Sequence, residues 1–335
     1  MILIANDVQD LTFKERLFHK AFDTVPHKRL LLKLKRYGIN GKMLNVVKNF
    51  LAGRSFHVKV GESLSKKFWV TSGIPQGSVL GPLLFLIYIN DLPDGLKSFL
   101  SLFADDAKML VNIDDIVATQ EDLDKLNRWQ KDWLLSFNTL IHKCKVLHVG
   151  KHNRKHEYFL DGSLLPQTSL EKDFGLYVNE KLDWSDHINR AINKTTSVIG
   201  WVNRNVITRE PLVMLNIYKS LIRPHIEYCV QIWSPRHGNW KIIMDIEDVQ
   251  RKFTRMIDGI GLLPYKERLE KLSITTLLER RMRGDLIEVF KIFRGLVDYG
   301  GSVIKFSRSG YNIVSTGRGT QKLDFFPNRV AKYWN

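Results

Sequence analysis

The residues that decide the fold are Thr71-Ser-Gly-Ile-Pro-Gln-Gly-Ser-Val-Leu-Gly-Pro-Leu-Leu-Phe85 and, after a spacer, Phe103-Ala-Asp-Asp106. Apolar runs on either side of the two aspartates predict a β-hairpin whose two-residue turn presents both carboxylates at a sheet edge. Carboxylates this close together repel each other unless a cation lies between them, so Asp105 and Asp106 favour a divalent metal. Gly73 opens a stiff turn ahead of an apolar helix, and such a turn lets the backbone approach a flat or phosphorylated ligand closely.

The chain is strongly basic. Its 335 residues include 51 Lys and Arg against 35 Asp and Glu, which gives a net charge of +16 and a pI near 9.7. This balance favours a polyanionic partner, because binding to phosphates releases condensed counterions. A solvated basic surface is the alternative. The apolar content of 44% is ample for the core of one large domain or two ordinary domains.

Signals for targeting and for disulfides are lacking in the sequence. Cys144 and Cys229 lie far apart and show no Cys/His ligand spacing, which fits a reducing compartment. The apolar run Met1–Ala5 is too short for a signal peptide. The longest apolar stretch, Val79–Ile89, is too short to cross a membrane and predicts a buried core helix. We therefore expect an intracellular protein with no transmembrane segment and no membrane partner.

Hydrophobic periodicity predicts strands separated by helices in the first half of the chain. Helical spacing is found in His27–Leu51 and Asp114–Phe137, and strand patterns in Phe56–Val60, Phe68–Val70 and Cys144–Val149. From about residue 185 the pattern predicts only helices, at His187–Val202, Leu212–Leu221, Met244–Ile257 and Thr276–Phe293. The first half therefore indicates a mixed sheet with packed helices.

Together, Thr71–Phe85 and Phe103–Asp106 resemble motifs B and C of the reverse transcriptases of non-LTR (LINE-type, Jockey-like) retrotransposons. The resemblance implies an α+β fold, in which a right-hand polymerase palm is followed by a mostly helical thumb, with the fingers largely missing. The implied activity is RNA-directed DNA synthesis in the nucleus or cytoplasm. The implied partners are an RNA template, a DNA primer and deoxynucleoside triphosphates, and the oligomeric state stays open.

The segment Arg16-Leu-Phe-His-Lys-Ala-Phe-Asp-Thr-Val-Pro-His-Lys28 resembles motif A of the family, except that Leu17 stands where the family has a metal-binding aspartate. Leucine cannot bind a cation, so we expect polymerisation to be slowed on the order of a thousandfold or more. A substituting carboxylate, Glu15 or Asp23, is the alternative. We interpret the chain as a truncated and mutated copy that is inactive.

The resemblance also implies a two-metal centre. In the family, carboxylates hold two Mg²⁺ ions roughly 3.5–4 Å apart, one at the primer hydroxyl and one at the triphosphate. By this resemblance Asp105 is the shared metal ligand, Asp106 the weaker second ligand, and Phe18 contributes its main-chain carbonyl.

Further site residues follow from the same motifs. Phe22 resembles the steric gate that rejects the ribose 2′-hydroxyl, although an aromatic core residue fits its pattern too. Gln76 and Gly77 are expected to line the nucleotide and template pocket, and a simple Pro-Gly turn before a helix is compatible with them. Lys143, with Lys145 as the runner-up, resembles the general acid of motif D; the alternative is an ordinary surface lysine.

We divide the chain into a remnant at residues 1–16, a palm at 17–184, a helical thumb and connection at 185–300, and a basic, partly disordered tail at 301–335. Tyr158–Gly162 and Glu171–Gly175 resemble the primer-grip hairpin of the family and the strand after it.

Two basic groups in the thumb region could follow the backbone of a duplex. They are Arg251/Lys252/Arg255 and Arg280/Arg281/Arg283. Two hypotheses compete with an active enzyme: a catalytically dead remnant that binds only RNA or an RNA–DNA hybrid, and a product without a selected role.

Overall fold

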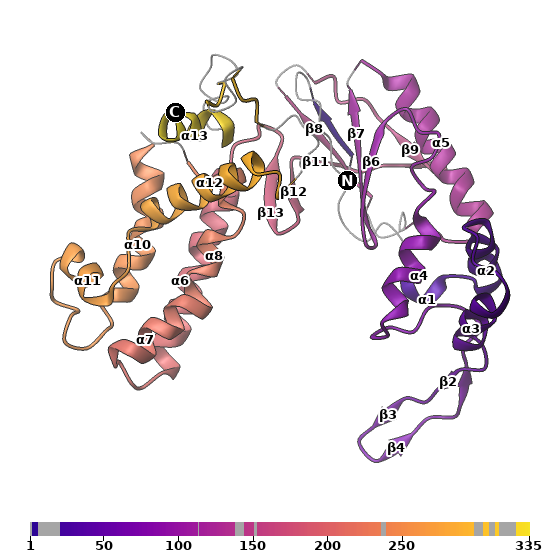
Figure 1. Ribbon diagram of the computed structural model, residues 1–335, viewed down its shortest axis with the longest axis horizontal. Coiled ribbons are helices and arrows are strands. Elements are labelled where there is room, and N and C mark those ends of the chain that lie inside the picture. The colour runs from indigo at the N-terminus through magenta and orange to yellow at the C-terminus, as the bar shows by residue number, and fades with distance from the viewer. Residues whose placement is uncertain are drawn as a thin grey trace. The chain divides into compact units, whose positions relative to one another are not determined.

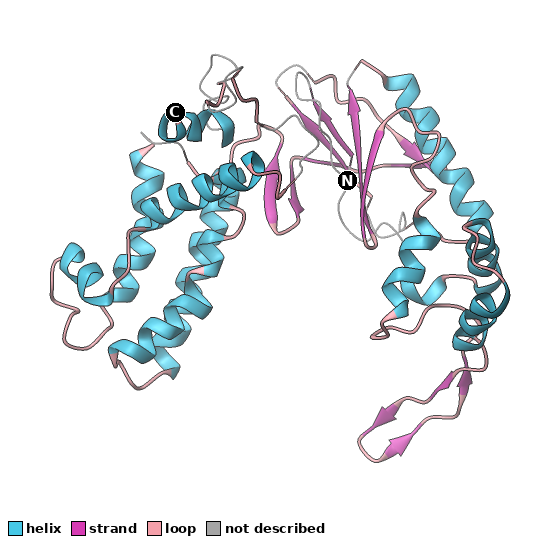
Figure 2. Cartoon of the chain, viewed as in Figure 1, coloured by secondary structure: helices cyan, strands magenta, loops and turns pink. Residues whose placement is uncertain are grey.

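The computed structural model describes residues 2–5, 21–112, 114–137, 144–150, 153–235, 239–297, 304–307, 312–314 and 326–335. The chain divides into two compact units, Met1–Leu182 and Asp183–Asn335. The first combines strands and helices and the second is mostly helical, so the fold is mixed α and β (Figures 1 and 2). No helix in the described ranges is both long and apolar enough to span a membrane.

Helices and short strands alternate along the first unit. The helices are α1 (Ala21–Thr24), α2 (His27–Arg36), α3 (Gly41–Leu51), α4 (Leu80–Ile89) and α5 (Ile116–Trp133). The strands are β1 (Ile2–Ala5), β2 (Ser55–Phe56), β3 (Lys59–Val60), β4 (Ser63–Leu64), β5 (Phe68–Trp69), β6 (Phe99–Phe103), β7 (Asp106–Asn112), β8 (Val146–Val149), β9 (Phe159–Leu160), β10 (Ser163–Leu164), β11 (Gln167–Thr168), β12 (Leu170–Asp173) and β13 (Leu176–Asn179).

Five of these strands form one sheet in the order β11-β8-β1-β7-β6. β6 and β7 are antiparallel neighbours at one edge, as the sequence predicted for the two-aspartate hairpin. β1 lies in the middle, parallel to β7 and β8, with Ile2 opposite both Met109 and Val146. From the sequence, residues 1–16 were expected to be a remnant separate from the palm. In the structure, Ile2–Ala5 pairs with two strands of this sheet.

The core of the first unit surrounds α4, the helix predicted from Val79–Ile89. This helix is apolar around its whole circumference, and Phe85 and Tyr88 are fully buried. It shares one hydrophobic core with Leu123 and Leu126 of α5. α5 ends before the predicted residue 137, because Leu134 adopts a left-handed conformation (φ 53°) and closes the last turn.

A lysine in this core was not foreseen. Lys33 of α2 is 1% exposed and donates hydrogen bonds to the Tyr88 carbonyl and to Asp91. Its Nζ lies 3.9 Å from the centroid of the Trp133 ring and 4.7 Å from that of Trp129. Burial lowers the pKa of Lys33 to about 8, although its hydrogen bond to Asp91 acts in the opposite direction. The lysine thus ties α2 to the segment after α4 and to α5.

In the second unit the described chain is built mainly from helices, as the periodicity predicted. They are α6 (Ser185–Asn205), α7 (Pro211–Ile217), a π-helical turn (Tyr218–Ile222), α8 (Pro224–Glu227), α9 (Val230–Trp233), α10 (Trp240–Thr254), α11 (Tyr265–Leu272), α12 (Leu277–Phe293) and α13 (Phe326–Trp334). α12 begins with a capping box, in which Thr276 and Glu279 satisfy each other's backbone N–H groups.

Part of the expected C-terminal tail is ordered. α13 packs Val330 against Val289 of α12 in a small core that also contains Ile304 and Ile313. Arg329 of α13 reaches inward to Asp285 with two hydrogen bonds of 2.8 and 2.9 Å. Residues 326–335 are therefore anchored by apolar packing and by one buried ion pair.

Candidate functional site

The two aspartates lie at the tip of the β6–β7 hairpin. Phe103 pairs with Asp106 across the ladder, so Ala104 and Asp105 form the two-residue turn and Asp106 begins β7. Of the two turn residues only Ala104 has a positive φ, 52°, which is the pattern of a type II′ turn. Both aspartates are half-buried. The hairpin thus places two hard oxygen donors next to each other at a strained turn.

A second hairpin contacts this one, and the sequence did not predict this contact. β12 and β13 are joined by Phe174 and Gly175, both with positive φ. The ring of Phe174 meets that of Phe103 edge to face, with 4.9 Å between the centroids. Lys108, two residues after Asp106, forms an ion pair with Asp173 and lies 4.0 Å from the Phe174 ring centroid. The strain of a phenylalanine with φ 42° is therefore offset by contacts that fix the aspartate hairpin.

The loop after Thr71 is clamped to α1 and to the residue that follows it. Gly73 donates its N–H to the Val25 carbonyl at 2.8 Å, and Ile74 donates to the Phe22 carbonyl at 2.7 Å. The Gly73 carbonyl accepts a hydrogen bond from Arg54 at 2.7 Å. Gly73 has φ +87°, and a Cβ there would lie 2.5 Å from the Asp23 carbonyl oxygen. Glycine is required at this position because no other residue fits so close to the neighbouring backbone.

The expected nucleotide-site residues come together at this clamp. Phe22 is half-buried and stacks on Phe85, with 4.5 Å between ring centroids. Gln76 is exposed and donates to the Asp23 carboxylate at 2.9 Å. Gly77 is exposed with φ +77°, and open space surrounds the position of a Cβ. The stacking accounts for one face of Phe22 and leaves its role as a steric gate a prediction.

Three predicted site residues, Leu17, Phe18 and Lys143, lie outside the described residues. The alternative general acid, Lys145, is described. Its Nζ lies 3.2 Å from a carboxylate oxygen of Glu171, a residue that is only 4% exposed. Lys145 is therefore held in an ion pair within the first unit. This ion pair accounts for its position beside a strand, and its role as a general acid stays a prediction.

The donor set at the hairpin fits Mg²⁺ in part. Asp105 and Asp106 supply the carboxylate oxygens that this ion prefers. Within the described ranges, no three His, Cys, Asp or Glu side chains gather closely enough to hold a metal ion. Asp23, considered as a substitute ligand, therefore does not join the two aspartates in such a group.

Of the two basic groups in the second unit, the one at residues 280–283 is largely internal. Arg280 is bound by the Glu227 carboxylate. Arg281 is 1% exposed, and burial lowers its pKa to about 10. Of the three, only Arg283 is exposed. The interpretation of this group as a surface that follows a duplex backbone is wrong for Arg281, because its side chain is buried inside the helical unit. Arg280 is half-exposed, and its guanidinium is engaged by Glu227.

Comparison with known proteins agrees with these motifs. Residues 18–189 match the family described as "Reverse transcriptase (RNA-dependent DNA polymerase)". The chain is 30% identical over 259 residues to the RNA-directed DNA polymerase from mobile element jockey of Drosophila melanogaster. The aligned region covers 72% of the chain and 27% of that protein. It is 28% identical over 252 residues to the probable RNA-directed DNA polymerase from transposon X-element of the same species, with the same two coverages.

A third relative is the probable RNA-directed DNA polymerase from transposon BS, also of Drosophila melanogaster. The identity is 30% over 232 residues, which make up 64% of the chain and 25% of that protein. The chain thus spans about a quarter of the length of the relatives that it matches. On the family match and these relatives, the chain belongs to the reverse transcriptase family, in the group encoded by jockey-like non-LTR retrotransposons.

Proposed function

We propose that the first unit is the palm of an RNA-directed DNA polymerase and the second unit its helical thumb, and that the polymerase activity is impaired in this chain. The observation that carries the proposal is the hairpin with Asp105 and Asp106 at its turn, held in place by the β12–β13 hairpin. Carboxylates on a fixed hairpin suit a reaction that depends mainly on positioning and electrostatics.

In this proposal Asp105 and Asp106 hold Mg²⁺, and Leu17 occupies the place of the missing ligand. When bound, the metal lowers the energy of the negative charge that develops as a primer hydroxyl attacks a nucleoside triphosphate. Phe103 and Phe174 keep the two carboxylates oriented. Because Leu17 offers no oxygen, we expect metal binding to be weak and catalysis to be slow.

The clamp around Gly73 provides the nucleotide side of the site. Phe22 stands against the sugar and Gln76 and Gly77 line the pocket, with Gln76 oriented by its hydrogen bond to Asp23. Lys143 is proposed to protonate the leaving diphosphate. The template and primer, an RNA–DNA hybrid, are the partners that such a site requires.

A second candidate function is nucleic-acid binding without catalysis. The net charge of +16 favours it, since charge-driven affinity survives the loss of one metal ligand. The two candidates differ in their dependence on ions: polymerisation requires Mg²⁺, whereas simple binding weakens steeply with salt and needs no metal.

Primer extension on a poly(rA)/oligo(dT) hybrid, with Mg²⁺ or Mn²⁺, tests the proposal. We expect little or no extension by the unmodified chain and recovery in Leu17→Asp, since the variant restores the third carboxylate. The double variant Leu17→Asp/Asp105→Ala is expected to lose the recovered activity. Mg²⁺ is also expected to raise the melting temperature of Leu17→Asp but not of the double variant.

Two results would contradict parts of this proposal. Extension by the unmodified chain that disappears in Asp105→Ala shows that another carboxylate replaces the missing ligand. Failure of Leu17→Asp both to extend the primer and to respond to Mg²⁺ shows that Leu17 is not the sole cause of the defect and leaves nucleic-acid binding as the function to test.

A further inference from the structure

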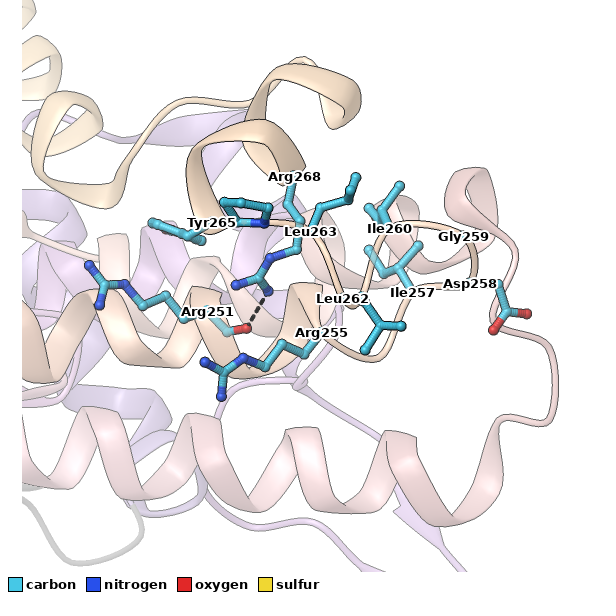
Figure 3. Close-up of a pocket in the computed structure, with 12 residues that line it drawn as sticks. Arg251, Arg255, Ile257, Asp258, Gly259, Ile260, Leu262, Leu263, Tyr265 and Arg268 are labelled. Carbon is cyan, nitrogen blue, oxygen red and sulfur yellow. Dashed lines mark hydrogen bonds between the residues drawn. The ribbon is translucent and has the colours of Figure 1, made fainter.

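The second unit contains a pocket of about 860 Å³ at the end of α10. Its walls are the last turns of α10, the loop at residues 257–263 and the start of α11 (Figure 3). Arg251 comes from α10, Arg255 directly follows that helix, and Arg268 comes from α11. Leu262 and Leu263 add apolar surface from the loop. The volume falls within the range of small-ligand sites.

Positive charge dominates the pocket. Besides the three arginines, the lining contains a single acidic residue, Asp258, which is exposed at the rim. In the described part of the chain no carboxylate lies within ion-pair distance of Arg255 or Arg268, and the nearest to Arg251, that of Asp248, is 3.7 Å away. Crowded guanidinium groups with so little compensation favour an anionic ligand.

The arginines are held in a fixed frame. Tyr265 lies between Arg251 and Arg268, with 4.9 and 5.3 Å from its ring centroid to the two guanidinium carbons. Its hydroxyl is bound by Glu247 and by Gln250. Because the ring cannot turn away, both guanidinium groups keep their positions without a ligand.

Two of the guanidinium groups retain free donors. Arg268 is 2% exposed, and its Nη1 donates to the Arg251 carbonyl, 2.8 Å away (Figure 3). The same nitrogen also donates to Thr254 Oγ1. Its Nε, and the Nε of Arg251, are shielded from solvent and have no hydrogen-bond partner among the described residues. Buried donors without an acceptor are costly, and an anion in the pocket would lower that cost through its charge.

We propose that this pocket binds a phosphate group of a nucleic-acid strand, with Arg255 as the accessible contact and Arg251 and Arg268 behind it. The guanidinium fork matches phosphate geometry better than any other side chain. Leu262 and Leu263 offer apolar surface to the attached sugar or base. The inference deepens the proposed function, since it names where the second unit holds the nucleic acid, and it does not depend on catalysis.

A matched pair of variants tests it. Arg255→Ala removes a charge inside the pocket. Lys252→Ala removes a charge three residues earlier, from an exposed side chain outside the lining, so the two variants separate the pocket from the wider basic group of Arg251, Lys252 and Arg255 expected from the sequence. We measure binding of a labelled single-stranded RNA by fluorescence anisotropy, in EDTA and without nucleoside triphosphates. We expect about a tenfold loss of affinity for Arg255→Ala and less than about threefold for Lys252→Ala. Arg255→Lys, which keeps the charge and loses the fork, is expected to fall between them.

Competition identifies the group that is bound. We expect a nucleoside monophosphate, and at higher concentration inorganic phosphate, to displace the RNA from the unmodified chain more readily than from Arg255→Ala. Equal losses in Arg255→Ala and Lys252→Ala overturn the proposal in favour of diffuse attraction. Phosphate binding that needs Arg255, combined with RNA binding that does not, makes the pocket a small-anion site. A failure of primer extension leaves all of these results unaffected, because the assay contains no metal.

Discussion

The loop after Thr71 and the arginine pocket both gather side chains from distant segments, but they are built in different ways. In the loop the backbone makes the contacts: Gly73 donates to the carbonyl of Val25, just after α1, and Ile74 to that of Phe22 within α1. A glycine conformation allows the approach. In the pocket side chains make the contacts, with Tyr265 fixed by Glu247 and in turn fixing two arginines.

This difference determines what each region tolerates. A backbone clamp accepts nearly any side chain that points outward but no added atom at the point of contact. A side-chain frame accepts changes at its exposed end, such as Arg255, but not at its half-buried anchor, Tyr265. The first kind of site leaves a short, recognisable motif in the sequence, and the second kind leaves scattered arginines.

The largest effect is expected from Gly73→Ala. The new Cβ would lie 2.5 Å from the Asp23 carbonyl oxygen, at a φ of +87° that alanine rarely adopts. We expect a loss of roughly 3 kcal/mol or more, from overlap and backbone strain together. Gly77→Ala is the control, since its φ of +77° is similar but open space surrounds it; it should cost only about 1–2 kcal/mol. Similar losses in urea unfolding of the two variants would show that the clamp does not need contact at Gly73.

A smaller effect is expected from Tyr265→Phe. The variant keeps the ring but removes the hydroxyl that Glu247 and Gln250 share, and we expect a loss of about 1–3 kcal/mol. RNA affinity should fall with it, because the arginines lose their fixed frame. Tyr228→Phe serves as the control, since Tyr228 is 53% exposed. Full RNA affinity in Tyr265→Phe, measured where the protein is folded, would contradict a frame built on this side chain.

The same tyrosine gives a pH dependence. Burial, and then the bond to Glu247, raise the pKa of Tyr265 well above its ordinary value of 10. Above pH 10 the unfolded chain loses this proton while the folded chain keeps it, so the free energy of unfolding falls as pH rises. The pKa values of Tyr88 and Tyr218 are raised by burial as well. We therefore expect Tyr265→Phe to lose stability less steeply than the unmodified chain between pH 10 and 11.5 in urea titrations. Parallel curves would contradict this.

Much of the fold was predictable because its signals are local. The aspartate hairpin, α4 and the helices of the second unit follow from apolar periodicity and from turn residues. The contact between Phe103 and Phe174 was not predictable, since it joins residues 71 positions apart. Nor was the burial of Lys33, because a lysine in an amphipathic helix is usually solvated. The groups that compensate for its burial, Asp91 and the rings of Trp129 and Trp133, lie far away in the sequence.

The smallest effect on stability and on RNA affinity is expected from a substitution at Arg281. This prediction distinguishes the pocket arginines from the second basic group, Arg280/Arg281/Arg283. All three guanidinium nitrogens of Arg281 are shielded and have no hydrogen-bond partner in the described chain. Asp285 remains paired with Arg329, and Glu247 remains bound to the N–H of Leu277, whether or not Arg281 is present.

Replacing a poorly paired buried charge by an apolar side chain of similar length is often neutral or stabilising. We therefore expect Arg281→Met to change the free energy of unfolding by less than about 1 kcal/mol and to leave RNA affinity unchanged. Arg329→Ala, which leaves Asp285 buried and unpaired, is the contrasting variant. Urea unfolding and anisotropy measure both. A loss of RNA affinity in a folded Arg281→Met protein would place nucleic acid on α12 and so remove the distinction between the two arginine groups.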